Sequence, residues 1–272
     1  MRHLLGFIVL ILFSFSSCQD KKKNNDLTSA KDNALAEVVF LDVYKQAQQY
    51  LGVYLEKRNP SDTAIKIYST TNQNNIIFPF TLTIYYGNND HLCDDNKYRR
   101  GSLKLYVTAV NADTTIYSVK SSSVIFDNYY LNQSKLMGTL DITNNGLNTS
   151  NKHNFDIDVS NGFIINANGT ISWNSTKTIT QTAGESTPND LSDDNYLLSG
   201  SAAGKDSKGT DFSENIATDC GIDPNCRWFI KTGKISVQPY NQEVRNCDYG
   251  TGGCTGQVKV QIKEESFNFS IQ

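Results

Sequence analysis

Apolar and polar residues alternate with a period of two in several separate segments of this chain. In 80–86, FTLTIYY, Phe80, Leu82 and Ile84 alternate with threonine and tyrosine, which is the pattern of a strand with one buried face. The same alternation recurs at Leu103, Leu105 and Val107, at Phe155, Ile157 and Val159, at Val258, Val260 and Ile262, and at Phe267, Phe269 and Ile271. Polar clusters typical of turns lie between these segments, at 86–90, 143–146, 166–169 and 249–253. Closely spaced strands joined by short turns predict a mainly β fold, an antiparallel meander or a sandwich.

One segment with helical spacing precedes the strands. In 34–55, ALAEVVFLDVYKQAQQYLGVYL, apolar residues recur every three or four positions, at Ala36, Phe40, Val43, Ala47 and Leu51. Asn33 is placed to cap the start of a helix there, and Gly52 is placed to end it. We therefore expect one N-terminal helix ahead of the sheet.

Two segments share an order of residues. Segments 81–107 and 243–262 both contain tyrosine, glycine, a loop with a cysteine, a second glycine and a strand, with Cys93 in the first loop and Cys254 in the second. This predicts a duplicated hairpin within one large domain of residues 34–272, with similar halves near 34–145 and 146–272.

The N-terminus has the layout of a secretory signal peptide. An apolar run from Leu4 to Phe15 follows Arg2 and is too short to cross a bilayer, which needs roughly 20 residues. Phe15, Ser16 and Ser17 lead directly into Cys18, and this resembles the lipobox of bacterial lipoproteins. The resemblance implies removal of residues 1–17, a diacylglyceryl group on Cys18 and acylation of the new amine. The alternative is ordinary cleavage nearby, with Cys18 left as a disulfide partner.

A polar stretch follows the cysteine. Residues 18–33 contain one leucine and one alanine after Cys18, which is too little apolar surface to offset ordering entropy, so we expect a flexible stalk. Gln19 stands where aspartate would follow the cysteine, and resemblance to lipoproteins then favours the outer membrane. The run of Lys21, Lys22 and Lys23 leaves the periplasmic and the surface leaflet as alternatives.

Taken with the segments at 126–146 and 196–216, the order of hairpins along 35–272 resembles a group of uncharacterised β-rich bacterial lipoproteins. This resemblance implies a β-rich fold and a membrane location, and it implies no catalytic residue.

Six cysteines minus a lipidated Cys18 leave five. Disulfides persist in exported proteins, so we expect one or two bridges among the last four, with the pairing open. A zinc site of four cysteines is the alternative, although its gaps of five and six residues are wider than usual. These four cysteines are Cys220, Cys226, Cys247 and Cys254.

Candidate binding residues lie in two acidic loops and at the two tryptophans. Carboxylates in one loop are hard ligands of the kind calcium prefers, and tryptophans stack on sugars, whereas solvated turns and core packing are the alternatives. The residues are Asp90, Asp94 and Asp95 in the first loop, Asp193 and Asp194 in the second, and Trp173 and Trp228.

The sequence contains no recognisable catalytic motif. The chain after the signal peptide has only His91 and His153, outside any HExxH motif, and no GxSxG motif occurs. Removing residues 1–17 leaves 24 basic against 28 acidic residues, which gives no electrostatic basis for nucleic-acid binding. Two hypotheses follow: a lipid-anchored outer-membrane lipoprotein of binding or structural type, with a glycan or a protein as partner, or an exported glycan-acting hydrolase using carboxylates that the sequence does not identify.

Overall fold

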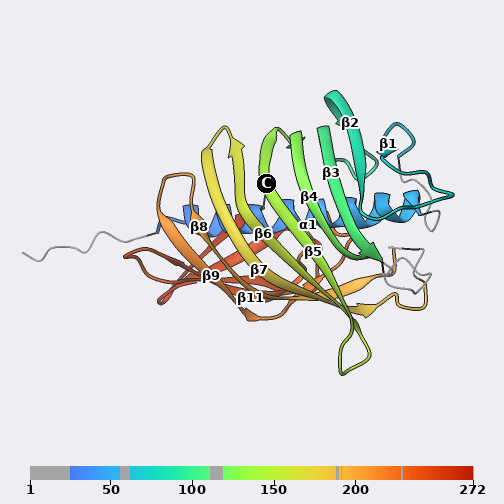
Figure 1. The fold of residues 1–272 in the computed structure, drawn as a ribbon. Coiled ribbons are helices and arrows are strands. Elements are labelled where there is room, and N and C mark those ends of the chain that lie inside the picture. Colours follow the sequence, from blue (N-terminus) through green and yellow to red (C-terminus); the bar gives the residue numbers. More distant parts are fainter. Residues whose placement is uncertain are drawn as a thin grey trace, which may run out of the picture.

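The computed structural model describes residues 25–55, 62–110, 119–187, 190, 192–227 and 229–271. Cys18, the signal peptide and Trp228 lie outside the described residues. The described part consists of one long helix and one large antiparallel sheet (Figure 1). Among the described helices, none is long and apolar enough to cross a membrane.

The sheet contains fourteen strands that follow one another in chain order along a single open sheet. One exception is the short β10, which pairs with β8, so that β11 lies beside β9. Of the two predicted arrangements, the antiparallel meander is the one observed. The strands are β1 (Lys66–Ser69), β2 (Phe80–Leu92), β3 (Tyr98–Val110), β4 (Val119–Leu131), β5 (Ser134–Leu147), β6 (His153–Asn166), β7 (Gly169–Ala183), β8 (Asn195–Lys205), β9 (Asp211–Thr218), β10 (Cys220–Ile222), β11 (Thr232–Pro239), β12 (Arg245–Thr251), β13 (Gln257–Ile262) and β14 (Glu265–Ser270).

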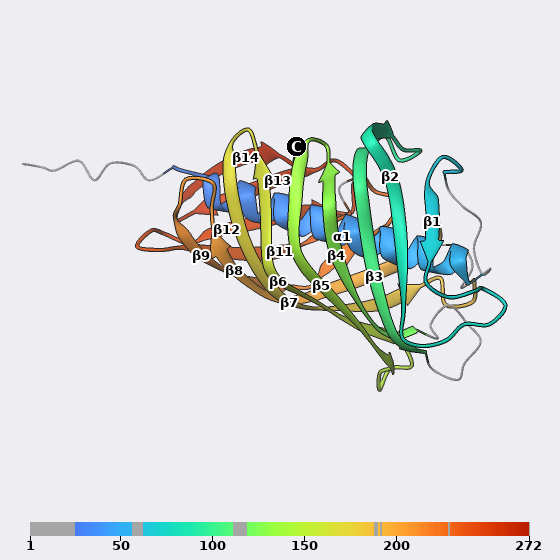
Figure 2. The same cartoon turned by 45° about the horizontal axis from the view of Figure 1, so that its top comes forward.

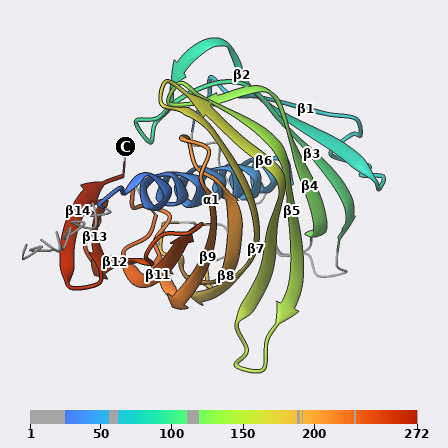
Figure 3. The ribbon, with the colours of Figure 1, turned by 90° about the vertical axis from the view of Figure 1, so that its left-hand side faces the viewer.

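Helix α1 (Thr28–Tyr54) lies inside the curve of this sheet. In the view of Figure 3, strands β2 to β9 curl around one side of the helix and β11 to β14 lie on the other. The oblique view shows the strands crossing it for most of its length (Figure 2). Buried residues therefore occur all around the helix, including Asn33, Glu37 and Asp42, rather than on one apolar stripe.

The helix is longer than its apolar pattern predicts. It begins at Thr28, so residues 28–33, expected as the end of the stalk, form its first turns. Asn33 does not cap it, because this residue lies fully buried inside the helix. The side chain of Asp26 instead accepts a hydrogen bond from the backbone N–H of Thr28. At the other end the helix continues past Gly52 to Tyr54.

The predicted alternation is confirmed in the strands, with Leu82, Leu103 and Val258 all fully buried on the face toward the helix. Two predicted turns are wrong, because 86–90 lies within β2 and 143–146 lies within β5. Gly87 and Gly146 adopt positive φ angles of 100° and 75°, and the strand register shifts at each. Glycine at positive φ is typical of a β-bulge, which bends a strand without ending it.

Further bulges bend the same part of the sheet. The register shifts at Gly101 between β3 and β4, and at Gly138 between β5 and β6. A Cβ atom on Gly101 would lie 2.1 Å from the carbonyl oxygen of Asn128, so this site has room only for glycine. The bulges help to explain how strands of 13 to 15 residues curve around a helix.

The two segments with similar residue order are both hairpins, β2–β3 and β12–β13. In each, a buried tyrosine, Tyr86 or Tyr249, precedes a glycine at positive φ. The expected boundary between halves at residue 145 falls inside β5, which pairs with β6 along its length. The two halves therefore share one sheet.

Candidate functional site

A groove runs beside the N-terminal half of α1, where the turns β6–β7 and β8–β9 approach the helix. Its larger part has a volume of about 590 Å³ and is bordered on the far side by β14. Its smaller part, about 260 Å³, continues along the helix toward the β4–β5 turn. Leu35 and Asn168 line both parts, so they form one groove.

The larger part presents mainly polar side chains together with a few apolar ones. Amides, hydroxyls, a carboxylate and two lysines can each donate or accept hydrogen bonds, and this suits a polar ligand. The lining residues are Thr28, Lys31, Asp32, Leu35, Asn168, Ser207, Lys208, Asn268, Phe269, Ser270 and Ile271.

Hydrogen bonds from distant strands hold the groove wall on the helix. Asp32 accepts a hydrogen bond from the backbone N–H of Ser207 at 2.7 Å, and the hydroxyl of Ser29 donates to Asp206 at 2.5 Å. Burial raises the pKa of Asp32, and the hydrogen bonds from Ser207 only partly offset this effect. The β8–β9 turn is thus fixed to the first turns of α1.

The start of the helix is also anchored from β12. Arg245 is fully buried and donates hydrogen bonds from Nε and Nη2 to the carbonyl oxygen of Asp26, at 3.2 and 3.0 Å. The side chain of Asp26 forms an exposed ion pair with Lys208 at 2.9 Å. These contacts set the position of the chain at the mouth of the groove.

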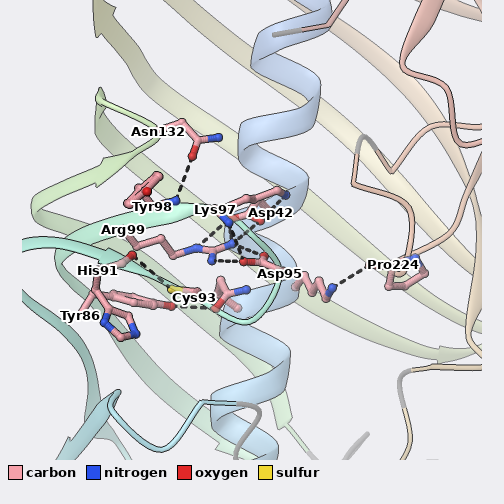
Figure 4. Close-up of polar contacts among 12 residues, drawn as sticks. Asp42, Tyr86, His91, Cys93, Asp95, Lys97, Tyr98, Arg99, Asn132 and Pro224 are labelled. Carbon is pink, nitrogen blue, oxygen red and sulfur yellow. Dashed lines mark hydrogen bonds and ion pairs between the residues drawn. The ribbon is translucent and has the colours of Figure 1, made fainter.

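A buried charged cluster lies at the other end of the groove, where one of its residues, Lys97, lines the smaller part. Figure 4 shows the polar contacts within this cluster. Lys97 donates to Asp42 of the helix at 2.8 Å. Arg99 donates to the same carboxylate at 2.7 Å and to Asp95 at 2.7 Å. Burial alone would raise the pKa of Asp42, but Arg99 and Lys97 outweigh it and lower the pKa to about 2.

A second buried ionic group joins the helix to β7 and β9. The ammonium of Lys177 lies 2.7 Å from Glu37 and 2.6 Å from Glu214, and all three side chains are almost completely buried. Burial, and after it the negative charge of Glu37, raises the pKa of Glu214 to about 8. Lys177 therefore contacts two buried carboxyl groups, one on the helix and one on β9.

These carboxylates do not form a hydrolytic site. A glycosidase needs two carboxyl groups that flank a bound sugar in an accessible cleft. Glu37 and Glu214 are 2% and 3% exposed, and both bind Lys177. Asp42 is fully buried and is held by two cationic side chains.

Trp173, a candidate binding aromatic, lies in the core rather than on the surface. Its indole is 1% exposed and stacks on Phe40 of the helix, with ring centroids 5.2 Å apart and an angle of 9° between planes. The indole N–H donates to the side-chain oxygen of Asn33 at 3.1 Å. Trp173 thus belongs to the core, which was the alternative left open by the sequence. Trp228 lies outside the described residues.

The predicted acidic loops separate into paired and exposed residues. Asp90 accepts from Arg100, and Asp95 accepts from Arg99, while Asp94 is exposed. Asp90 lies within β2 rather than in the expected loop, and the carboxylates of Asp90 and Asp95 are both held by arginines.

In the second loop, Asp194 is buried and accepts hydrogen bonds from Gln181 and Tyr196, at 2.8 and 2.6 Å. Asp193 accepts from the Thr187 hydroxyl at 2.5 Å. The two carboxylates stabilise the segment before β8, and neither lines the groove.

The cysteines form one of the expected bridges. Cys226 and Cys254 are joined in a disulfide, while Cys220 and Cys247 are free and buried, as is Cys93. The disulfide excludes the four-cysteine zinc site, because two of its ligands are bonded to each other. It also joins the β12–β13 hairpin to the loop after β10.

Sequence reasoning missed the groove and both charged clusters. No known protein family, characterised protein or solved structure matches this chain. Glu37 and Asp42 gave one sequence signal, since carboxylates on the apolar stretch of a helix need buried partners.

Proposed function

We propose that this chain is a lipid-anchored lipoprotein of the bacterial outer membrane, tethered through Cys18, that binds a polar ligand in the groove beside α1. The tether is supported by the short apolar run that ends at Cys18 and by the resemblance to β-rich lipoproteins. The groove carries the binding proposal, because it is the place where polar side chains of the helix and of distant turns converge.

The groove lies close to the tether along the chain. Nine residues lie between Cys18 and Thr28, which lines the groove, and a chain of ten residue steps spans at most about 35 Å. A ligand in the groove is then held within a few tens of ångströms of the membrane surface. This placement suits a component of the cell envelope.

The lining favours a glycan as the ligand class. Hydroxyl and amide groups of Asn168, Ser207 and Asn268 supply the paired donors and acceptors that sugar hydroxyls need. Lys31 and Lys208 add positive charge at the same surface, which favours a glycan that carries acidic groups. A polar segment of a protein partner is the alternative occupant.

The proposal is tested with the full-length protein purified in detergent and applied to a glycan array that includes acidic polysaccharides. We expect binding that Lys208→Ala and Asn168→Ala weaken by about tenfold, the equivalent of about 1.4 kcal/mol. Lys104→Ala is the matched control, because it removes an exposed ion pair with Asp127 on β3 and β4, outside the groove. Equal affinity of the Lys208 and Lys104 variants would contradict the groove assignment.

The same samples distinguish binding from catalysis. We expect no release of reducing sugar from the bound glycans. Turnover that a single Asp→Asn or Glu→Gln substitution abolishes would replace the binding proposal with the exported hydrolase.

A further inference from the structure

Three metal-ligating side chains of different chemistry meet at the outer end of β2. They are Asp62, which precedes β1, His91 near the end of β2, and Cys93, which follows it. One donor atom from each residue lies within 4.8 Å of the others. We propose that these three side chains bind a zinc ion, with the fourth position open to solvent or to a ligand.

Backbone geometry places the nitrogen and sulfur donors on one side of the chain. His91 and Cys93 are two residues apart at the end of an extended strand, where alternate side chains point the same way. The turn after Cys93 is closed by a hydrogen bond from its N–H to the carbonyl oxygen of Lys97 at 3.0 Å. Figure 4 shows the Cys93 sulfur beside the His91 backbone, next to the cluster around Arg99.

The third donor comes from a separate segment that is fixed locally. Asp62 accepts a hydrogen bond from the backbone N–H of Ala64 through Oδ1, and its Oδ2 lies 2.7 Å from Nε2 of His91. Oδ2 and the imidazole thus already face each other.

A zinc ion requires only a small rearrangement of this group. Tetrahedral zinc with bonds of about 2.0 to 2.3 Å places its ligand atoms about 3.3 to 3.6 Å apart. The observed spacing, 2.7 Å at the closest pair and at most 4.8 Å, brackets those values. Shifts of about 1 Å in side chains at the edge of the fold would be enough.

Charge and ligand type favour zinc over a hard cation. Thiolate and imidazole donors suit zinc, whereas calcium and magnesium take oxygen ligands. A zinc ion bound by one carboxylate and one thiolate forms an electrically neutral group, so the bound site places no net positive charge beside Arg99. Burial raises the pKa of the Cys93 thiol and Arg99 partly offsets this, so the metal would displace the thiol proton on binding.

The accessibility of the three residues suits a site with an open position. The side chain of His91 is 30% exposed and that of Asp62 is 10% exposed, while Cys93 is buried. Sites with three protein ligands and one solvent position are typical of zinc that binds or polarises a further molecule. This site differs from the four-cysteine arrangement that the Cys226–Cys254 disulfide excludes.

The test is titration of the full-length protein, stripped of metal, with Zn²⁺ against a chromophoric chelator and with Co²⁺ followed by absorption. We expect one equivalent to bind, with the near-ultraviolet band that marks cobalt bound to a thiolate. Cys93→Ser should abolish that band and weaken Zn²⁺ binding by at least about tenfold. Cys247→Ser, which removes another free buried cysteine, should leave both unchanged.

His91→Gln provides a second test in case Cys93→Ser fails to fold, because His91 is partly exposed and its replacement should disturb the fold less. It should melt as the wild type does without metal and lose the thermal stabilisation that Zn²⁺ gives the wild type. Absence of saturable binding by the wild type overturns the proposal. Retention of the thiolate band in Cys93→Ser, or unchanged affinity in His91→Gln, overturns it as well.

Discussion

Lys177 on β7 holds the carboxylate of Glu37 on the helix at 2.7 Å, in a position that is almost completely closed to water. The same ammonium binds Glu214 on β9 at 2.6 Å. The central helix is thus joined to the sheet by a buried ion pair as well as by apolar packing. Such a pair contributes to stability mainly through the cost of leaving either partner alone.

Replacing Lys177 with methionine should lower the free energy of unfolding by about 3 to 5 kcal/mol, because the buried side chains of Glu37 and Glu214 both lose the ammonium group that they contact. Chemical denaturation of purified protein measures this. Lys104→Met removes an exposed ion pair with Asp127 and should cost less than about 1 kcal/mol. Adding Glu37→Gln and Glu214→Gln to Lys177→Met should recover part of the loss. Equal losses in the free energy of unfolding for the Lys177 and Lys104 variants would contradict a stabilising role for the buried contacts of Lys177.

Glu214 should make the protein less stable as pH rises from about 5 to 8. Its pKa is about 8 in the folded protein, against an ordinary value of 4.5, so in this range only the folded state binds the proton. Stability from this group is complete below pH 4.5 and is lost as pH rises through 8. Denaturation at several pH values should show a decline that Glu214→Gln reduces. Parallel curves for the two proteins would show that Glu214 titrates normally.

Gly101→Ala should destabilise the protein by several kcal/mol, or prevent folding. The new methyl group would lie 2.1 Å from a backbone oxygen of Asn128, at a φ of +80°. Gly209→Ala is the control, because its φ is +87° and no atom lies within 4 Å of the added Cβ. The control should lose only about 1 kcal/mol from backbone strain. Thermal unfolding of both variants separates the steric effect from the strain.

Reduction should release two thiols, from Cys226 and Cys254. Mass analysis after alkylation of unfolded protein, with and without reductant, should show a difference of two labels. Cys254→Ser should lower stability by about 3 kcal/mol, because the bridge closes a loop across a sequence separation of 28 residues. Reductant should remove this difference between variant and wild type. A difference of zero or four labels would contradict the observed pairing.

Cys18→Ser should release the protein from the membrane fraction or leave residues 1–17 attached, since the lipid attachment site is gone. Cell fractionation and intact-mass analysis of the product check both outcomes. Cys93→Ser, which changes a cysteine inside the fold, should leave processing and membrane attachment unchanged. A processed, membrane-bound Cys18→Ser protein would mean that another feature provides the tether.

The strand positions were predictable because burial of one strand face leaves a period of two in the sequence, as at Leu103, Leu105 and Val107. The lengths of the strands could not be predicted in the same way. Gly87 and Gly146 occur in clusters that are typical of turns, and the same left-handed conformation that suits a turn also suits a bulge. Local sequence does not distinguish the two, because the neighbouring strand decides whether pairing continues.

The position of the helix was the main feature that the sequence did not reveal. Its apolar spacing predicted a helix ahead of the sheet but not its enclosure by the sheet, in which Glu37 and Asp42 are buried by partners on β3, β7 and β9. Those partners are 55 to 177 residues away, as are the turns that form the groove. Contacts at such separations leave no periodic trace in a single chain. A bridge among the last four cysteines was predicted on the expectation that the chain is exported, but its pairing could not be predicted.

The central helix is the first part of the fold to be synthesised, and the strands that enclose it follow. The hydrogen-bond partner of Ser29, Asp206, is synthesised much later. Arg245, which binds the carbonyl oxygen of Asp26, follows it by 219 residues. At ordinary rates of translation that interval is on the order of ten seconds or more. Until the later strands are synthesised, the apolar residues of this segment lack the partners that they pack against in the completed fold. Folding is therefore completed only when the last strands are present. A chain truncated before β12 should fail to form a smaller stable domain.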